Sequence, residues 1–357
     1  MARDFARPFP TGPALESLCE RIADRADATR TVGPWRSGVF QQLAESGCLA
    51  GWIAPVDGGT GAAEPAIMEL LVAVAGRCLT SALALTQWAS AVRILGRADQ
   101  ATRQRLLPGL AAGHQFTTVG ISQLTTSRQH LARPAVSAHP GPAGWRLTGT
   151  CPWVTGADSV HTIVTGAVTK PVDSAAEPRF FAIDAASPGV TVEPPLEMLA
   201  VSGSRTSCVR LEEVPVVAEM PPATTPGGQT GGLGTTALAL GSTRAALRLI
   251  DDEADRRPAL MPVAAELTRE ANAIERVFRQ AAGNGCEAAE RNQLRQRANA
   301  LVTRAAQAAL TASKGAGFVV GHPAERLLRE SMFFLVWSCP QPVTESLLCD
   351  LAGLAAD

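Results

Sequence analysis

Hydrophobic positions recur every three to four residues near both ends of the chain and fall into short clusters between them. Apolar residues at positions 15, 18, 22 and 26 predict an amphipathic helix near the N-terminus. Residues 63–95 are mostly apolar and long enough for two packed helices. Gly47 predicts the end of one helix, and Asp99 predicts the N-cap of another that closes near Pro108. Residues 1–115 therefore predict a helical domain.

The pattern changes over residues 116–219, where short runs rich in β-branched residues stand between Gly and Pro. These runs, such as "FTTVGIS" and "VHTIVTGAV", predict a small β domain. Residues 220–234 are rich in Pro, Gly and Thr and predict a linker loop. Helical periodicity returns over 235–357 and predicts a bundle of four or five helices. Because helices and strands are segregated along the chain, the predicted fold class is α+β.

Composition narrows the function classes. Of the 357 residues 46% are hydrophobic and 18% charged, and the formal net charge is −1, which predicts a globular protein without a basic surface for nucleic acid. No apolar run reaches the roughly 18 residues that span a bilayer. The eight cysteines and five histidines are scattered without the spacing of a disulfide framework or a metal site. Reduced thiols favour a cytoplasmic protein.

Six segments occur in the order found in one flavoenzyme family. They include "FQQLAESGCLAGWIAPVDGGTG", "GRADQATRQRLLPGLAAGH", "GISQLTTSRQ", "GWRLTGTCPWVTGA", "AVSGSRTSCVRLEEVPV" and "KGAGFVVGHPAERLLRES". Together they resemble the acyl-CoA dehydrogenase family over most of the chain. The resemblance implies an N-terminal helical domain, a middle β domain and a C-terminal four-helix bundle. It also implies FAD as cofactor, an acyl thioester as substrate and an oligomer.

The resemblance assigns residues to a flavin site. Trp153, Val154 and Thr155 would lie against the isoalloxazine ring, with Thr155 near its N5 atom. A flavin ring needs an aromatic lid and hydrogen-bond donors at its edge, which these residue types supply. In its other assignments, Ile121, Ser122 and Gly315 contact the flavin, while Ser127 and Trp337 contact the substrate.

Several positions depart from the family pattern. Gln123 stands where the family has glutamate, and Thr311 where it has a flavin-binding glutamine. The arginine–phenylalanine–glycine motif that binds the adenine half is missing, although Arg257 lies nearby. Pro340 and Pro342 replace a threonine and a glutamine that bind flavin, and each removes a backbone donor.

The usual base is missing as well. Ser338 occupies the position of the family's catalytic glutamate, and the alternative position, near Gly234, lies in a stretch with no acid between Glu219 and Asp251. Removing an α-proton from a thioester at neutral pH needs a carboxylate within reach, which a serine hydroxyl cannot replace unaided. Glu345, a turn or two beyond Ser338, is a candidate for a relocated base but more often such an acid is solvated.

Three hypotheses remain open from the sequence. The chain is the base-less subunit of a heteromeric acyl-CoA dehydrogenase, in which each flavin lies between two unlike subunits. Alternatively, it is a flavin-dependent monooxygenase of the same fold, a group that also lacks the glutamate. In the third hypothesis it has lost flavin and has a non-redox or scaffolding role.

Overall fold

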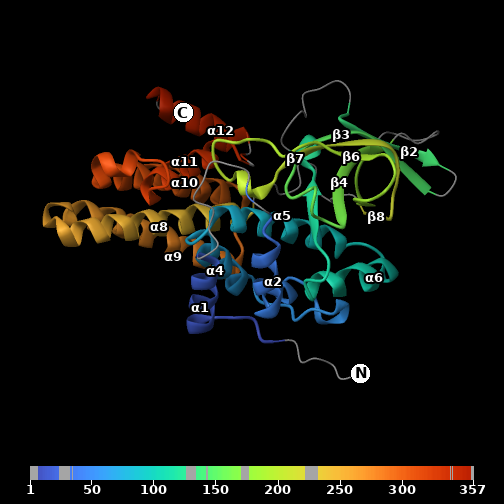
Figure 1. Cartoon of the computed structure of the whole chain (residues 1–357), viewed down its shortest axis with the longest axis horizontal. Coiled ribbons are helices and arrows are strands. Elements are labelled where there is room, and N and C mark those ends of the chain that lie inside the picture. The colour runs from blue at the N-terminus through green and yellow to red at the C-terminus, as the bar shows by residue number, and fades with distance from the viewer. Residues whose placement is uncertain are drawn as a thin grey trace.

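The computed structural model describes residues 7–23, 33, 35–125, 134–141, 144–169, 177–221, 232–337, 339 and 341–354. Helices form both ends of the chain and the strands lie between them in sequence (Figure 1). The predicted α+β class is thereby confirmed. None of the helices among these residues is long and apolar enough to cross a membrane.

In the N-terminal region, Gly47 and Asp99 mark helix boundaries as the sequence predicts. Gly47 has φ 77° and follows α2, and the Asp99 side chain accepts a hydrogen bond from Thr102 N at 2.9 Å as the N-cap of α6. The sequence placed the end of α6 near Pro108, but the helix continues to Ala111. The elements are α1 (Gly12–Ala23), α2 (Ser37–Glu45), α3 (Cys48–Gly51), η1 (Pro55–Asp57), α4 (Glu64–Ala75), α5 (Leu79–Leu95) and α6 (Gln100–Ala111).

The middle region is one mixed sheet in the order β6-β7-β3-β2-β4-β5-β8, with β1 pairing in parallel to β4. It has its own small core of buried side chains, which includes Leu147, Val154 and Phe181. The strands are β1 (Thr117–Gly120), β2 (Val136–Gly141), β3 (Gly144–Val154), β4 (Thr162–Thr169), β5 (Pro178–Asp184), β6 (Val190–Val192), β7 (Ser207–Pro215) and β8 (Ala218–Met220). Two short helices interrupt them, α7 (Ser122–Thr125) and η2 (Ser202–Ser204).

The C-terminal region is a bundle that packs against the N-terminal helices. Gly241 of α8 permits the closest approach, because a Cβ atom there would overlap the carbonyl oxygen of Val72 in α4. The helices are α8 (Leu233–Arg256), η3 (Pro258–Leu260), α9 (Met261–Asn284), α10 (Ala288–Ser313), η4 (Lys314–Phe318), α11 (Pro323–Ser331), η5 (Met332–Leu335) and α12 (Gln341–Ala352).

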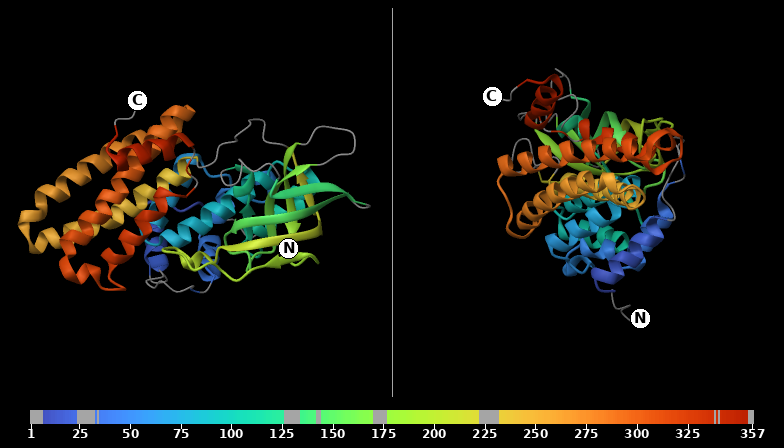
Figure 2. Two further views of the ribbon diagram at one scale, coloured as in Figure 1. Left: turned by 90° about the horizontal axis from the view of Figure 1, so that it is seen from above. Right: turned by 90° about the vertical axis from the view of Figure 1, so that its left-hand side faces the viewer.

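Helix α5 lies at the centre of the molecule, between the bundle and the sheet (Figures 1 and 2). It packs against β1, η2 and α8. One continuous hydrophobic core joins the N-terminal helices to the bundle and includes Trp88 of α5, which is 1% exposed. Strand β1, the η2 turn and helix α8 are therefore arranged around a single central helix.

Candidate functional site

The end of strand β3 presents Trp153 outside the sheet core. The register between β3 and β7 shifts between Cys151 and Val154, so the pairing is irregular at Trp153. Such a bulge redirects a side chain out of the regular alternation. Val154 is fully buried, whereas Trp153 is 50% exposed. The exposed indole face is available to stack on a flat ring.

Thr155 begins a chain of three buried hydroxyl groups. Its Oγ1 lies 3.2 Å from Thr206 Oγ1, which in turn lies 2.9 Å from Ser204 Oγ. Ser204 belongs to η2, whose neighbours Val201 and Arg205 have φ values of 55° and 49°. The left-handed conformation is rare for a β-branched residue, and strain of this kind is concentrated at functional sites. The strained turn fixes the position of the Thr155 hydroxyl.

An ion pair and backbone hydrogen bonds hold this turn against the end of β3. Arg205 Nε donates to Asp158 Oδ2 at 2.8 Å, and Gly156 N donates to the carbonyl of Ser204 at 3.0 Å. Burial acts to raise the pKa of Asp158, but hydrogen bonds from Arg205 and Ser159 outweigh it and hold the pKa below its ordinary value. The end of β3 and η2 thus form one rigid unit.

The segment after β1 carries the loop residues that the sequence assigns to flavin. Gln123 replaces the family glutamate and anchors the segment, since its Nε2 donates to the carbonyls of Gly120 at 2.8 Å and Gly166 at 3.0 Å. Ile121 is half-buried beside it. Ser122 Oγ is buried and has no hydrogen-bond partner in the described part of the chain. Ser127 lies outside the described residues.

Two side chains of α10 hold the segment around the usual base position. Arg295, 1% exposed, donates from Nη2 to the carbonyl of Trp337 at 2.7 Å, and Asn299 Nδ2 donates to the carbonyl of Phe334 at 3.0 Å. The Trp337 ring stacks on Phe333 with centroids 4.7 Å apart. Phe334 is fully buried, whereas Phe333 and Trp337 are half-buried.

Of the three residues that follow Trp337, the structure describes only Cys339. Ser338 and Pro340 lie outside the described residues. Burial raises the pKa of the Cys339 thiol, although the nearby Arg295 guanidinium, 3.7 Å from its sulfur, acts in the opposite direction. A thiol held in its neutral form is a poor nucleophile.

The corner between α8 and α10 holds the other positions tied to the flavin by resemblance. Arg257 donates to Glu253 Oε2 at 2.6 Å and to the carbonyl of Ala312, so its guanidinium is engaged within the chain. Thr311 hydroxyl donates to the Gln307 carbonyl of its own helix at 2.9 Å. At Gly315 a Cβ atom would have no neighbour within 4 Å. The surface around Gly315 is therefore open, but the nearby Arg257 guanidinium already has partners within the chain.

Of the two expected base positions, the structure describes only Gly234, where no acidic side chain stands. Gly234, in the first turn of α8, has only Leu71 Cδ1 at 3.6 Å and Thr86 Cγ2 at 4.0 Å from where a Cβ would lie. Glu345 is exposed on α12. No cluster of His, Cys, Asp and Glu among the described residues could hold a metal ion.

The described residues fit one half of a flavin. Trp153 offers an exposed side chain, Thr155 an oriented hydroxyl, and Ser122 a buried hydroxyl that has no hydrogen-bond partner among the described residues. These would hold the isoalloxazine, which supplies two-electron redox chemistry when bound. The adenine half has no equivalent fit, because Arg257 is already engaged with Glu253.

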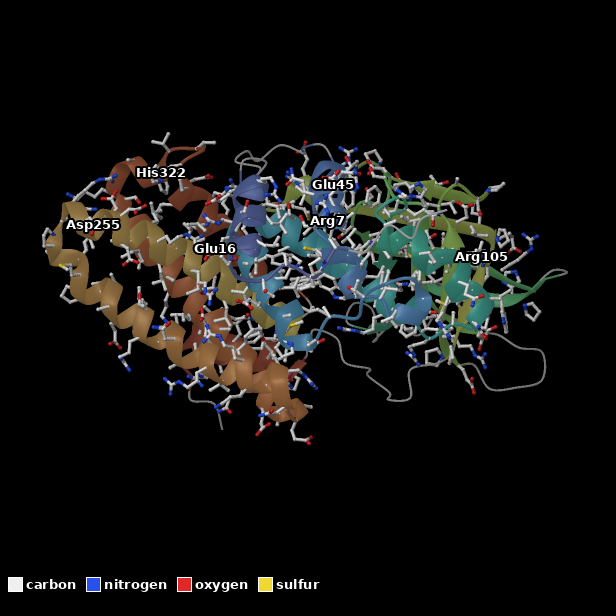
Figure 3. All side chains as sticks on the ribbon, turned by 90° about the horizontal axis from the view of Figure 1, so that it is seen from below. Arg7, Glu16, Glu45, Arg105, Asp255 and His322 are labelled. Atoms are coloured by element: carbon white, nitrogen blue, oxygen red, sulfur yellow. The ribbon has the colours of Figure 1, made fainter. Side chains whose placement is uncertain are left out.

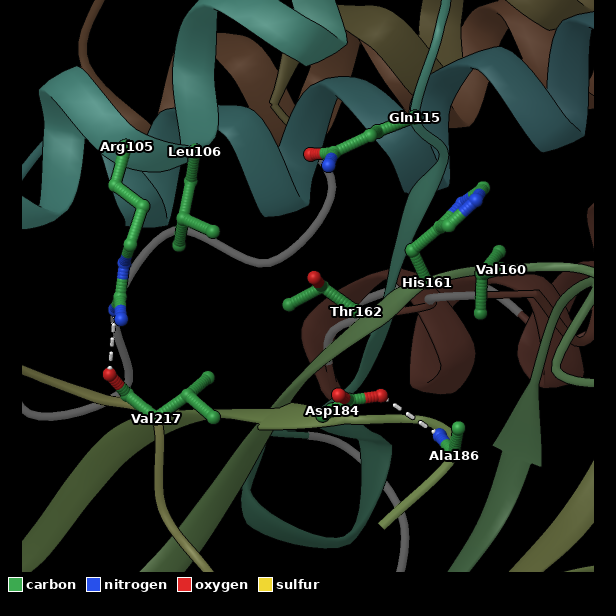
Figure 4. A pocket seen from close by; sticks show the side chains of 9 residues that line it. All are labelled: Arg105, Leu106, Gln115, Val160, His161, Thr162, Asp184, Ala186 and Val217. Atoms are coloured by element: carbon green, nitrogen blue, oxygen red, sulfur yellow. Dashed lines mark hydrogen bonds between the residues drawn. The ribbon is translucent and has the colours of Figure 1, made fainter.

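A separate pocket of about 380 Å³ lies between α6 and the strands β4 and β5 (Figure 4). His161 lines it and accepts a hydrogen bond at Nδ1 from Phe116 N at 3.1 Å. Arg105 and Asp184 line it as well, each held by a backbone partner. Figure 3 places Arg105 far from Asp255 at the end of the bundle. The sequence held no signal for this pocket, since its residues come from five separate segments.

Comparison with known proteins identifies the fold. No family model matches the chain, and no curated protein matches its sequence. Among solved structures, KijD3 in complex with dTDP is 21% identical with a TM-score of 0.78, covering 97% of this chain and 99% of that one. Glutaryl-coenzyme A dehydrogenase with glutaryl-CoA is 17% identical with a TM-score of 0.78, covering 97% of each chain.

A third similar structure widens the range of activities on this fold. Dibenzothiophene monooxygenase TdsC from Paenibacillus sp. A11-2 is 17% identical with a TM-score of 0.76, covering 95% of this chain and 96% of that one. Both KijD3 and TdsC have also been solved with FMN. The chain has the acyl-CoA dehydrogenase fold, which flavoproteins with dehydrogenase and monooxygenase activity share.

Proposed function

We propose that the chain is the base-less subunit of a heteromeric, FAD-dependent enzyme that desaturates an acyl thioester. The single observation that carries the proposal is the unequal fit of the flavin site. The side that would face the isoalloxazine has an exposed Trp153 and an unsatisfied Ser122 hydroxyl, while Arg257 on the opposite side is engaged within the chain. A shared site between unlike subunits requires each chain to keep only its own half.

In this arrangement the chain's own residues bind and orient, and the partner removes the α-proton. Trp153 would stack on the flavin ring and the Thr155 hydroxyl, fixed by Thr206 and Ser204, would donate to its edge. A bound FAD would supply the two-electron acceptor for the hydride that leaves the β-carbon as the partner's base takes the α-proton and the double bond forms. Neither Ser338 nor the Gly234 position supplies a carboxylate, so the base comes from the other subunit.

The proposal includes a partner of the same fold and a cytoplasmic location. Exposed apolar side chains include Phe318 of η4, which is 80% exposed, and Val320 just after η4 and Leu351 of α12, which are each 68% exposed. Exposed apolar groups of this kind suit contact with a second subunit.

The test compares the chain alone with the chain co-expressed with a same-fold partner that carries the glutamate. Reduction of an artificial electron acceptor by acyl-CoA is measured in both. Activity only in the mixed complex is expected. Turnover by the chain alone at about 1–1000 per second, typical of enzymes, would overturn the proposal. Oxygen-dependent hydroxylation of an added substrate with reduced flavin would instead favour the monooxygenase alternative.

A further inference from the structure

Helix α5 is buried on nearly every side but leaves one polar stripe partly open. Between Leu79 and Leu95 every residue is buried except Thr86, Gln87 and Ser90, which are half-buried, and Arg93, which is exposed. We call the first three the α5 polar stripe. A helix that is otherwise surrounded by the core has no packing need for three adjacent polar side chains.

Hydrogen bonding within the helix uses up the hydroxyl protons of the stripe. Thr86 Oγ1 donates to the Leu83 carbonyl at 2.7 Å, and Ser90 Oγ donates to the Thr86 carbonyl at 2.8 Å. Gln87 Nε2 donates to Thr86 Oγ1 at 3.3 Å. Both hydroxyl oxygens therefore remain as acceptors only.

The carboxamide of Gln87 has hydrogen-bond donor and acceptor positions that the described residues leave unused. Its oxygen accepts no hydrogen bond from any residue that the structure describes, and its second N–H is likewise unused. Leaving such groups against a hydrocarbon would forfeit their hydrogen bonds with water without replacement. A ligand that suits the stripe must supply a donor, and a hydroxyl group supplies a donor and an acceptor together.

The stripe lies beside the candidate site. Thr86 Cγ2 is 4.0 Å from the position a Cβ would take at Gly234, where the family's alternative base would stand. The same helix packs against η2, which carries the Ser204 end of the hydroxyl chain from Thr155. The stripe therefore lies on the helix that contacts both the Gly234 end of α8 and the turn that carries Ser204.

We propose that Gln87 binds a hydroxyl group on the acyl chain of the substrate, so the substrate class is a hydroxyacyl thioester. The inference rests on the proposed function and deepens it. The Gln87 oxygen accepts the hydroxyl proton, and its unused N–H donates to the hydroxyl oxygen. A carboxylate, which only accepts, would instead face the acceptor oxygens of Thr86 and Ser90 and is disfavoured.

The test is calorimetric titration of the full chain, alone and in the mixed complex. The probes are butyryl-CoA, hydroxybutyryl-CoA with its hydroxyl on the third or the fourth carbon, and succinyl-CoA. One hydroxybutyryl isomer is expected to bind about fivefold to tenfold more tightly than butyryl-CoA, as one or two neutral hydrogen bonds allow. Gln87→Leu is expected to abolish that preference without weakening butyryl-CoA binding.

The matched control is Gln41→Leu, because Gln41 is exposed on α2 and its amide donates to Glu45. This variant should keep the preference for the hydroxylated probe. Equal affinity for the hydroxylated and unsubstituted probes, or a preference that survives Gln87→Leu, would overturn the inference and leave the proposed function standing. Failure of every acyl-CoA to bind, alone or in the complex, would instead reject the acyl thioester itself and the inference with it.

Discussion

Trp153 is the residue on which the isoalloxazine half of the site depends. Replacing it with alanine removes a ring contact worth roughly 1–3 kcal/mol, so flavin affinity in the mixed complex should fall by one to two decades. Because the side chain is 50% exposed, the free energy of unfolding should change little. Flavin retention after gel filtration and urea unfolding measure the two effects.

The matched control is Trp145, on the same strand, whose indole donates to Glu219 at 3.0 Å and contacts Phe181. Trp145→Ala should lower stability and leave flavin affinity near that of the parent. Equal flavin retention in the Trp153→Ala and parent complexes would mean that the ring does not lie on this tryptophan.

Gly234 is the position where a base could be introduced with least disturbance. A glutamate there would begin in ordinary contact with Leu71 and Thr86. In a mixed complex whose partner has lost its glutamate, Gly234→Glu should restore acyl-CoA-dependent dye reduction by at least about tenfold, since a positioned base contributes about 10²–10⁴-fold. Full activity of the partner variant before this change would show that the base lies elsewhere.

Three buried thiols predict alkaline destabilisation. Burial raises the pKa of Cys19 to about 11 and that of Cys48 and Cys151 to about 12, from the ordinary value of 9.0 that applies in the unfolded chain. Above pH 9 the unfolded chain loses these protons and the folded chain keeps them, so stability present below pH 9 is lost as pH rises toward 11. Each thiol contributes about 1.4 kcal/mol per pH unit.

Urea unfolding under reducing conditions at several pH values from 8 to 11 measures this slope, and the absence of tyrosine simplifies the interpretation. Cys48→Ala should flatten it by about one thiol's share, whereas Cys349→Ala, at a half-buried position on α12, should leave it unchanged. An identical slope in the parent and the Cys48→Ala variant would contradict the assignment.

At the scale of elements, helix periodicity and cap chemistry predicted most helices. Asp99 caps α6 because its carboxylate reaches the Thr102 N–H, a local interaction that the sequence reveals. Helix α6 continues beyond Pro108 because a proline near the last turn removes only one backbone hydrogen bond. Hydrophobic periodicity alone does not show how small this loss is. The bulge at Trp153 depends on the partner strand β7, so no local pattern could predict it.

The crossing of α4 and α8 gives a prediction at this scale. Gly241→Val should destabilise the fold by about 1–3 kcal/mol, because the new side chain would overlap the Val72 carbonyl and force the helices apart. Gly283→Ala, on α9 with nothing within 4 Å, should be neutral or stabilising by about 0.4–1 kcal/mol. Thermal unfolding compares them, and equal midpoints for the two variants would contradict the close approach.

At the scale of the whole molecule, the order of helices, strands and helices was enough to predict the fold, which the solved structures of this fold confirm. For the site, the sequence predicted candidate residues but not how they are arranged. Trp153 and Thr155 could be named from the strand motif, but the hydroxyl chain to Ser204 joins segments about fifty residues apart. The sequence did not predict the α5 polar stripe, because three polar residues within a mostly apolar segment do not change its helical periodicity.

The central claim is that this chain holds only half of a flavin. Native mass spectrometry of the desalted protein, alone and in the mixed complex, tests it most directly by counting FAD per chain. The account predicts no retained FAD on the chain alone and one FAD for each pair of unlike chains. One FAD retained on every copy of the unaccompanied chain would contradict it.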